Sequence, residues 1–288
     1  MPRLPALLPV LFLLAAAAFL PRATPQPSIP ALPAKRAYLG FDRNTYPGDA
    51  ALAVLRRTFA FTGYWLGPPP GETVNTWQGK RELLRSAGFG FLVLYRGRTE
   101  RELKNAADAQ RIGAEDAQAT SEAAKREGFP PDTIIFLDIE EGGRLSPAYH
   151  SYLQGWLWTL TQLGYQGGFY CSGIPVELGA KSTVTTADDI TGFLFLKSRP
   201  FTIWAYNDAC PPSPGCAFPE SPPSPETSGI SGAEIWQFAQ SPRRKEFTAH
   251  CPPGYHKDGN CYAPGDTVHA WFLDVNSATS PDPSGARK

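Results

Sequence analysis

Two acidic residues close the most apolar run of the chain. Asp138 and Glu140 end the segment Thr133-Ile134-Ile135-Phe136-Leu137-Asp138-Ile139-Glu140, which is typical of a buried strand. Side chains alternate along a strand, so both carboxyls should point to one face, with Cα atoms roughly 6.6 Å apart. Like charges this close raise at least one pKa, and one carboxyl then holds a proton near neutral pH. Hydrolysis of a glycosidic bond needs such a pair, an acid for the leaving oxygen and a second carboxylate opposite the developing positive charge.

An acidic pair by itself also fits a metal site or a solvated loop. Two further carboxylates favour a reactive site. Asp42 ends the run Tyr38-Leu39-Gly40-Phe41, and Asp274 lies near the end of another apolar run and is followed by Asn276. In a barrel of parallel strands the active site lies at the carboxyl ends of the strands. We therefore expect all four carboxylates to lie on one rim.

Short apolar runs alternate with helical patterns along the chain, as in βαβ units. No Gly-rich phosphate fingerprint follows a strand, so a (β/α)₈ TIM-type barrel is favoured over a dinucleotide-binding sheet. We expect a single α/β domain over residues 37–280 and a flexible tail over 281–288. Segment 172–200 has no clear assignment. The expected strands are 38–42, 61–66, 89–95, 133–140, 167–171, 201–206, 234–238 and 270–275, and the expected helices are 50–59, 80–87, 114–127 and 146–163.

Composition narrows the class of protein. Of 288 residues, 42% are hydrophobic and 19% are charged, which fits a globular chain. The 27 basic residues balance the 27 acidic ones, so no global field attracts nucleic acid or an anionic membrane. We expect a polysaccharide partner, no nucleic acid, no cofactor and a monomer.

The N-terminus predicts export. Leu7–Leu20 is apolar apart from Pro9 and follows Arg3, a run that is short for a bilayer span but fits a signal-peptide core. We assign residues 1–24 to a signal peptide and 25–36 to a proline-rich linker. The mature protein is then secreted, with no membrane span after cleavage. An uncleaved N-terminal anchor is the alternative.

The five cysteines fit an exported chain. Two local pairs, Cys210 with Cys216 and Cys251 with Cys261, would each close a Pro- and Gly-containing loop by a disulfide. These pairs fall in the predicted loop insertions 208–232 and 241–268. Cys171 remains, and its apolar surroundings predict a buried free thiol. A metal site of Cys251 and Cys261 with His250 and His256 is the alternative, but the spacing is not that of zinc pairs, and we expect no metal.

Aromatic residues flank the predicted strands, and sugars stack on aromatic faces. The expected substrate-binding aromatics are Tyr64, Tyr95, Tyr170, Trp204, Tyr206 and Trp236. Each taken singly could equally be a core or helix-packing residue, because barrel strands carry many such side chains.

Six short motifs in order resemble family 25 glycoside hydrolases, lysozymes of the N-acetylmuramidase type with a β/α barrel. The region up to about residue 130 is equally similar to a related glycoside-hydrolase-like domain named after a mycobacterial secreted protein. The resemblance covers roughly residues 37–278. The motifs are Gly40-Phe41-Asp42, Phe136-Leu137-Asp138-Ile139-Glu140, Gly168-Phe169-Tyr170, Ile203-Trp204-Ala205-Tyr206, Ile235-Trp236-Gln237-Phe238 and Phe272-Leu273-Asp274-Val275-Asn276.

The resemblance implies cleavage of the β-1,4 bond between N-acetylmuramic acid and N-acetylglucosamine in peptidoglycan or a similar amino-sugar polymer. It assigns the general acid to Glu140, and pairs it with Asp138, as nucleophile or as orienter of the acetamido group. Asp42 and Asp274 match the family's first- and last-strand aspartates. Gln237 and Asn276 lie in the matching motifs and are expected to contact substrate.

Three features depart from the lysozyme pattern: the cysteine-bearing insertions, the absence of a basic residue in 61–66, and the loop Glu141-Gly142-Gly143. Two other functions therefore stay open. The same barrel could hold cell-wall glycan without cutting it, because fold does not certify activity. Alternatively, the proline-rich loops could be the working surface of an envelope interaction protein.

Overall fold

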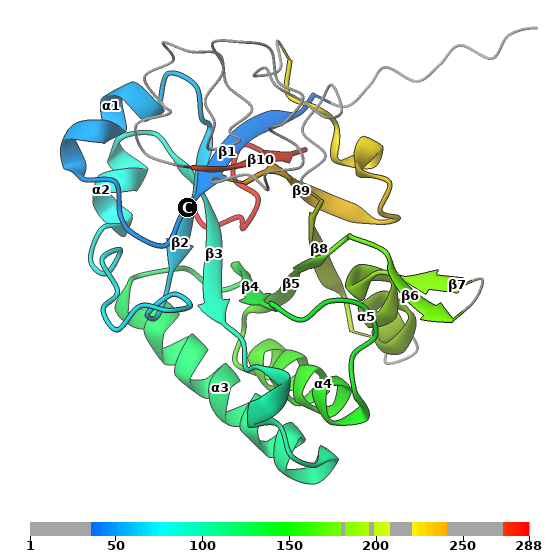
Figure 1. Ribbon diagram of the computed structural model, residues 1–288. Coiled ribbons are helices and arrows are strands. Elements are labelled where there is room, and N and C mark those ends of the chain that lie inside the picture. Colours follow the sequence, from blue (N-terminus) through cyan, green and yellow to red (C-terminus); the bar gives the residue numbers. More distant parts are fainter. Residues whose placement is uncertain (1–35, 180–181, 196–198, 208–220, 241–272, 288) are drawn as a thin grey trace, which may run out of the picture. The chain divides into compact units, whose positions relative to one another are not determined.

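The alternating apolar runs close into a barrel of eight strands (Figure 1). The computed structural model describes residues 36–179, 182–195, 199–207, 221–240 and 273–287. The strands follow one another around the barrel in the order β1-β10-β9-β8-β5-β4-β3-β2. Their bounds are β1 Tyr38–Asp42, β2 Phe61–Trp65, β3 Gly90–Arg96, β4 Ile134–Asp138, β5 Gln166–Ser172, β8 Phe201–Tyr206, β9 Ala233–Ala239 and β10 Asp274–Ala278. The TIM-type fold class predicted from the sequence is confirmed.

Helices cover the outside of the barrel. They are α1 Leu52–Leu55, α2 Arg81–Ser86, α3 Ala106–Arg126, α4 Pro147–Gln162 and α5 Thr186–Phe195. Short 3₁₀ turns η1 Asp49–Ala51, η2 Glu100–Glu102 and η3 Pro225–Ser228 complete the connections. Segment 172–200 contains α5 and a small antiparallel hairpin, β6 Val176–Gly179 with β7 Ser182–Val184. All described residues belong to one compact unit, Ala34–Lys288.

Helix α3 is longer than predicted and begins at Ala106 instead of residue 114. The side chain of Asn105 accepts a hydrogen bond from the backbone of Asp108, which caps the first turn. The predicted stop is correct, since Gly128 takes a positive φ of 78° just past the helix. α3 packs closely on α4, and glycines permit the contact: a Cβ on Gly155 would lie 2.2 Å from the Gln110 carbonyl oxygen.

The last strand corrects the sequence prediction. The strand expected at 270–275 begins instead at Asp274 and runs antiparallel to both β1 and β9. A purely parallel barrel is therefore replaced by a mixed one. Residues 270–272 of the expected strand lie outside the described part of the chain. Since β10 runs the other way, its first residue, not its last, lies beside the carboxyl end of β1.

The C-terminal segment is also corrected. Residues 281–287 are not a flexible tail but pack between β3 and β4 at the bottom of the barrel. Ser284 is fully buried; its hydroxyl accepts from the Val93 backbone and its carbonyl from Ile134, both at 2.9 Å. The Asp282 carboxylate accepts from the Phe91 backbone. The segment thus completes hydrogen bonds that two diverging strands would leave open.

Several predicted features lie outside the described residues. These are the signal peptide and linker up to residue 35, the two cysteine pairs Cys210 with Cys216 and Cys251 with Cys261, and the alternative metal ligands His250 and His256. Among the described helices, none has the length and apolar character needed to cross a membrane.

Candidate active site

A polar cavity opens at the rim where the parallel strands end. Its volume is about 190 Å³. Register explains how the strands supply it: Asp138 lies opposite Tyr170, Tyr170 opposite Trp204, and Asp42 opposite Asp274. Residues in register share a face, so these side chains all point inward. The cavity is lined by Asp42, Asn44, Trp65, Pro70, Leu94, Asp138, Glu140, Tyr170, Trp204, Gln237, Gln240 and Asp274.

All four predicted catalytic carboxylates line this cavity. Asp42 and Asp138 end strands β1 and β4, and Glu140 follows β4 by two residues, as the sequence suggested. Asp274 reaches the rim for a different reason, because it begins the antiparallel strand and pairs with Asp42. The sequence prediction was wrong about the bounds and the direction of β10, yet Asp274 still lies at the predicted rim.

Asp42 is held by two amides. One of its oxygens accepts from Asn276 Nδ2 at 2.6 Å and from Gln237 Nε2 at 3.0 Å. Burial outweighs these bonds and raises the pKa of Asp42 from its ordinary value of 3.8 to about 6. Asn276 is fixed in turn by the indole N–H of Trp204 at 2.9 Å, and Gln237 by the hydroxyl of Tyr170 at 2.8 Å. The carboxylate, amides and aromatics form one connected network.

Asp138 and Glu140 lie close enough to interact as like charges. Burial, and then the charges of Glu140 and Asp42, raise the pKa of Asp138 well above its ordinary range. The pKa of Glu140 is raised as well, chiefly by desolvation in the cavity, although the residue as a whole is exposed at the mouth. Oδ2 of Asp138 is buried and receives no hydrogen bond from the described residues. Such a pair titrates as a unit and keeps its last proton to a higher pH than an isolated carboxyl does.

Three predicted substrate-binding aromatics lie on the wrong face of their strands. Tyr64 is fully buried outside the barrel, where its hydroxyl donates to Glu127 at the end of α3. Tyr95 faces α3, and the Trp236 indole donates to the Asn207 carbonyl. The reason is the two-residue period: each lies one position from an inward-facing residue. We withdraw these three from the site.

The remaining predicted residues point inward. Tyr170, Trp204 and Gln237 line the cavity, and Asn276 binds Asp42 behind it. Tyr206 lies opposite Gln237 in the register and so shares the inner face. Sequence reasoning missed Trp65, Leu94, Asn44, Pro70 and Gln240 as lining residues. Strand parity relative to Asp42 and Asp138 would have found Trp65 in place of Tyr64.

Cysteine and metal-binding groups were the other candidates for chemistry. Cys171 is a fully buried free thiol, as predicted, and burial raises its pKa. Within the described ranges, no group of three or more His, Cys, Asp or Glu side chains could hold a metal ion.

Residues 74–208 match the family model of the Rv2525c-like, glycoside hydrolase-like domain. The resemblance inferred from the sequence is thereby confirmed over this segment. No curated protein sequence matches the chain.

Solved structures share the fold. An uncharacterized protein of B. stearothermophilus aligns with a TM-score of 0.52 and 18% identity, over 84% of this chain and 95% of that one. The Tat-secreted protein Rv2525c of Mycobacterium tuberculosis, in complex with L-tartrate, aligns at 0.51 and 15% identity, over 88% and 100%. The spore cortex lytic enzyme SleM of Clostridium perfringens gives 0.49 and 14%, over 85% and 68%. At these identities the first two comparisons establish the barrel alone.

Proposed function

We propose that the chain is a secreted glycoside hydrolase that cleaves β-1,4 bonds in peptidoglycan or a similar amino-sugar polymer. The observation that carries the proposal is the Asp138–Glu140 pair, two carboxyls with raised pKa values that line one cavity together with Trp and Tyr side chains. Secretion rests on the apolar N-terminal run and fits the Tat-secreted relative of the same fold.

Glu140 is the general acid in this mechanism. It is the member of the pair that reaches the mouth of the cavity, where a polymer can approach, while Asp138 is 4% exposed. Substrate entry excludes water, and the proton shared by the pair passes through Glu140 to the glycosidic oxygen as the bond breaks. Asp138, left as a carboxylate, stabilises the positive charge that develops on the sugar or orients its acetamido group.

Asp42 and Asp274 set the electrostatic background. The negative charge of Asp42 raises the pKa of Asp138 and so helps to keep the shared proton in place. Asp274 lies beside Asp42, and its negative charge attracts that of Arg43. Tyr170, which is partly exposed in the cavity, supplies aromatic surface for a sugar ring, and the buried Trp65 and Trp204 form the wall around it.

Reducing-end release from purified peptidoglycan tests the proposal. Glu140→Gln keeps the size of the side chain and removes the transferable proton, so release should fall by about 10²–10⁴-fold. Glu141→Gln is the matched control. Glu141 accepts a hydrogen bond from the Glu100 backbone, which an amide oxygen also accepts, so release should persist.

Two outcomes would overturn the assignment. If neither the wild type nor the variants release reducing ends while all sediment with the polymer, the barrel is a non-catalytic glycan-binding module. If Glu140→Gln releases ends as fast as the wild type, the barrel cuts with other residues.

A further inference from the structure

Strand β3 brings a cation to the rim of the carboxylate cavity. Leu94 lines the cavity, and Arg96, two residues further along the strand, has the parity of the same inner face. Arg96 lies opposite Asp138 in the register of β3 with β4. Residues in register on neighbouring strands lie about 5 Å apart and point the same way. The backbone therefore places Arg96 beside the buried carboxyl of Asp138.

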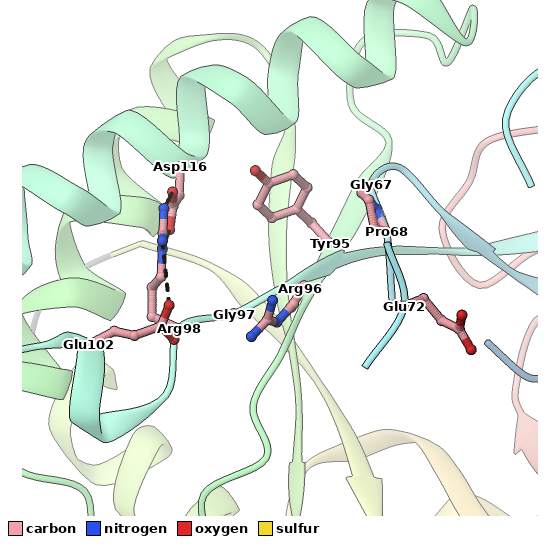
Figure 2. Close-up of a pocket in the computed structure, with 9 residues that line it drawn as sticks. All are labelled: Gly67, Pro68, Glu72, Tyr95, Arg96, Gly97, Arg98, Glu102 and Asp116. Carbon is pink, nitrogen blue, oxygen red and sulfur yellow. Dashed lines mark hydrogen bonds and ion pairs between the residues drawn. The ribbon is translucent and has the colours of Figure 1, made fainter. Parts of the chain in front are cut away.

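Arg96 is not committed to the structural ion pair next to it (Figure 2). Arg98 binds Asp116 through two hydrogen bonds of 2.7 and 2.8 Å and lies 3.6 Å from Glu102. These bonds hold η2 against α3. In the view of Figure 2, Arg96 lies between the Arg98–Asp116 pair and Glu72, and no dashed bond joins it to another residue drawn. Its side chain is exposed, so its charge can act on the rim.

The proposed mechanism needs the proton of the carboxyl pair on Glu140 and the negative charge on Asp138. Burial alone favours the opposite arrangement. Asp138 is 4% exposed, whereas Glu140 is exposed at the mouth, so ionising Asp138 costs more desolvation. Oδ2 of Asp138 also receives no hydrogen bond from the described residues that would stabilise the ionised form. Another interaction is needed to draw the negative charge inward.

The charges around Asp138 act in two directions. Those of Glu140 and Asp42 raise the pKa of Asp138, and that of Arg96 lowers it. Arg96 therefore opposes both the repulsion from the neighbouring carboxylates and the burial. The other titratable groups around the pair are those of Tyr149, Tyr170, Glu141 and Asp274.

We propose that Arg96 is a positioning residue for the proton of the pair, because it holds the negative charge on Asp138 and leaves the proton on Glu140. The inference rests on the proposed function, which assigns the general acid to Glu140. It adds a residue from β3 to a site whose acids come from β1, β4 and β10, and it explains how the more deeply buried carboxyl becomes the ionised one.

Substrate entry strengthens the effect. A polymer over the mouth displaces water from Glu140, whereas Asp138 has little water left to lose. The ionised form of Glu140 then becomes more costly, and the attraction between Arg96 and Asp138 is less screened. The proton moves from the Asp138 carboxyl to the Glu140 carboxylate, and the pair keeps one negative charge throughout.

Carbon-13 NMR follows both carboxyls directly, in protein labelled at the side-chain carboxyl carbons of Asp and Glu. Asp138→Asn and Glu140→Gln identify the two signals by their disappearance. In Arg96→Gln the titration midpoint of Asp138 should rise by about 0.5–1 pH unit, the size expected for one solvent-screened charge on a neighbouring strand. The midpoint of Glu140 should fall, because Asp138 then keeps the proton to a higher pH.

Arg101→Gln is the matched control. Arg101 is an exposed arginine of η2 that does not line the cavity, and its loss changes the net charge by the same amount. Both midpoints should stay where they are in the wild type. Arg96→Lys keeps the positive charge and should titrate nearly as the wild type does. An Asp138 midpoint that Arg96→Gln leaves unchanged, or that Arg101→Gln moves as far, would overturn the inference.

Hydrolysis of soluble peptidoglycan fragments gives a second readout. Arg96→Gln should lower kcat by about three- to tenfold, because a shift of one pH unit changes the share of the reactive protonation state about tenfold. KM should stay nearly constant, since Arg96 acts on Asp138 and not on the glycan. An unchanged kcat would contradict the role of Arg96 in placing the proton.

The two proposals fail separately. If the wild type releases reducing ends but Arg96→Gln moves neither midpoint, the role of Arg96 is wrong and the hydrolase stands. If the two midpoints move in opposite directions but no ends are released, Arg96 places the charge as inferred and the hydrolase proposal fails.

Discussion

Asp42→Asn gives a quantitative test of the electrostatics around the site. The buried carboxyl has its pKa raised from 3.8 to about 6, so the folded protein binds this proton more tightly than the unfolded chain does. A raised carboxyl pKa costs stability above the folded value, and the cost disappears as the pH falls toward the unfolded value. The full pKa shift corresponds to a loss of about 3 kcal/mol in the unfolding free energy at high pH. About 2 kcal/mol of this loss is recovered when the pH falls from about 7 to about 4.5.

The assay is urea unfolding of the wild type and Asp42→Asn at these two pH values. An asparagine oxygen can accept the same two amide hydrogen bonds, from Asn276 and Gln237, without titrating. All other titrating groups contribute alike to both proteins, apart from close neighbours such as Asp138. The unfolding free energy of the wild type should therefore gain about 2 kcal/mol relative to the variant on acidification.

Parallel pH dependences in the two proteins would refute the reasoning. That result would mean that Asp42 titrates alike in the folded and unfolded states, so that hydrogen bonds from Asn276 and Gln237 offset its burial. A wild type that loses stability relative to the variant on acidification would mean that the pKa is lowered. Either result would also contradict the electrostatic explanation given above for the raised pKa of Asp138.

Three other expectations concern packing, the C-terminal segment and the pH profile. Gly155→Ala should destabilise the protein by about 1–3 kcal/mol in urea unfolding, because its Cβ would meet the Gln110 carbonyl at 2.2 Å. Gly192→Ala in α5, with no atom within 4 Å of the new Cβ, should be neutral or stabilising. If the two variants lost the same amount of unfolding free energy, α3 and α4 would not be in close contact. Ser284→Ala should lower the unfolding free energy by about 1–3 kcal/mol, because it leaves the buried Val93 N–H unpaired. Ser221→Ala, at an exposed position, should leave it almost unchanged. A Ser284 variant as stable as the wild type would contradict the packing of the C-terminal segment. Hydrolysis should decline as the pH rises through the raised pKa values of Asp138 and Glu140, so a rate–pH profile that falls with a midpoint below the ordinary 4.5 of Glu would exclude Glu140 as the acid.

The sequence predicted most of the strands because each is an apolar run bounded by clear stops. It also placed Asp42, Asp138 and Glu140, since acids that follow such runs must reach the rim, whereas Asp274 reaches it as the first residue of an antiparallel strand. It failed for β10, a five-residue strand whose Asn276 and Ser277 are polar yet buried, so hydropathy gives little signal there. The direction of that strand depends on a tertiary pairing with β1 that no local pattern encodes.

Two other failures have local causes. Tyr64 and Trp65 are both aromatic, so residue type does not tell which of them faces the cavity. Only the parity of the strand distinguishes its inner from its outer face. Segment 281–287 has the Pro, Ser, Asp and Gly composition of a loop. Its Asp282 and Ser284 side chains nevertheless supply acceptors to strand β3, a use of turn residues that composition does not reveal.

The antiparallel strand has a consequence for how the chain folds as it is made. Asn276 bonds to Asp42 across 234 positions of sequence, so β1 acquires one of its two neighbours only after β10 has been synthesised. Until then β1 and β9 remain open edges that can pair with other chains. Contacts between such distant residues also slow folding. A nascent chain of this kind should depend on holding chaperones until β10 has emerged from the ribosome.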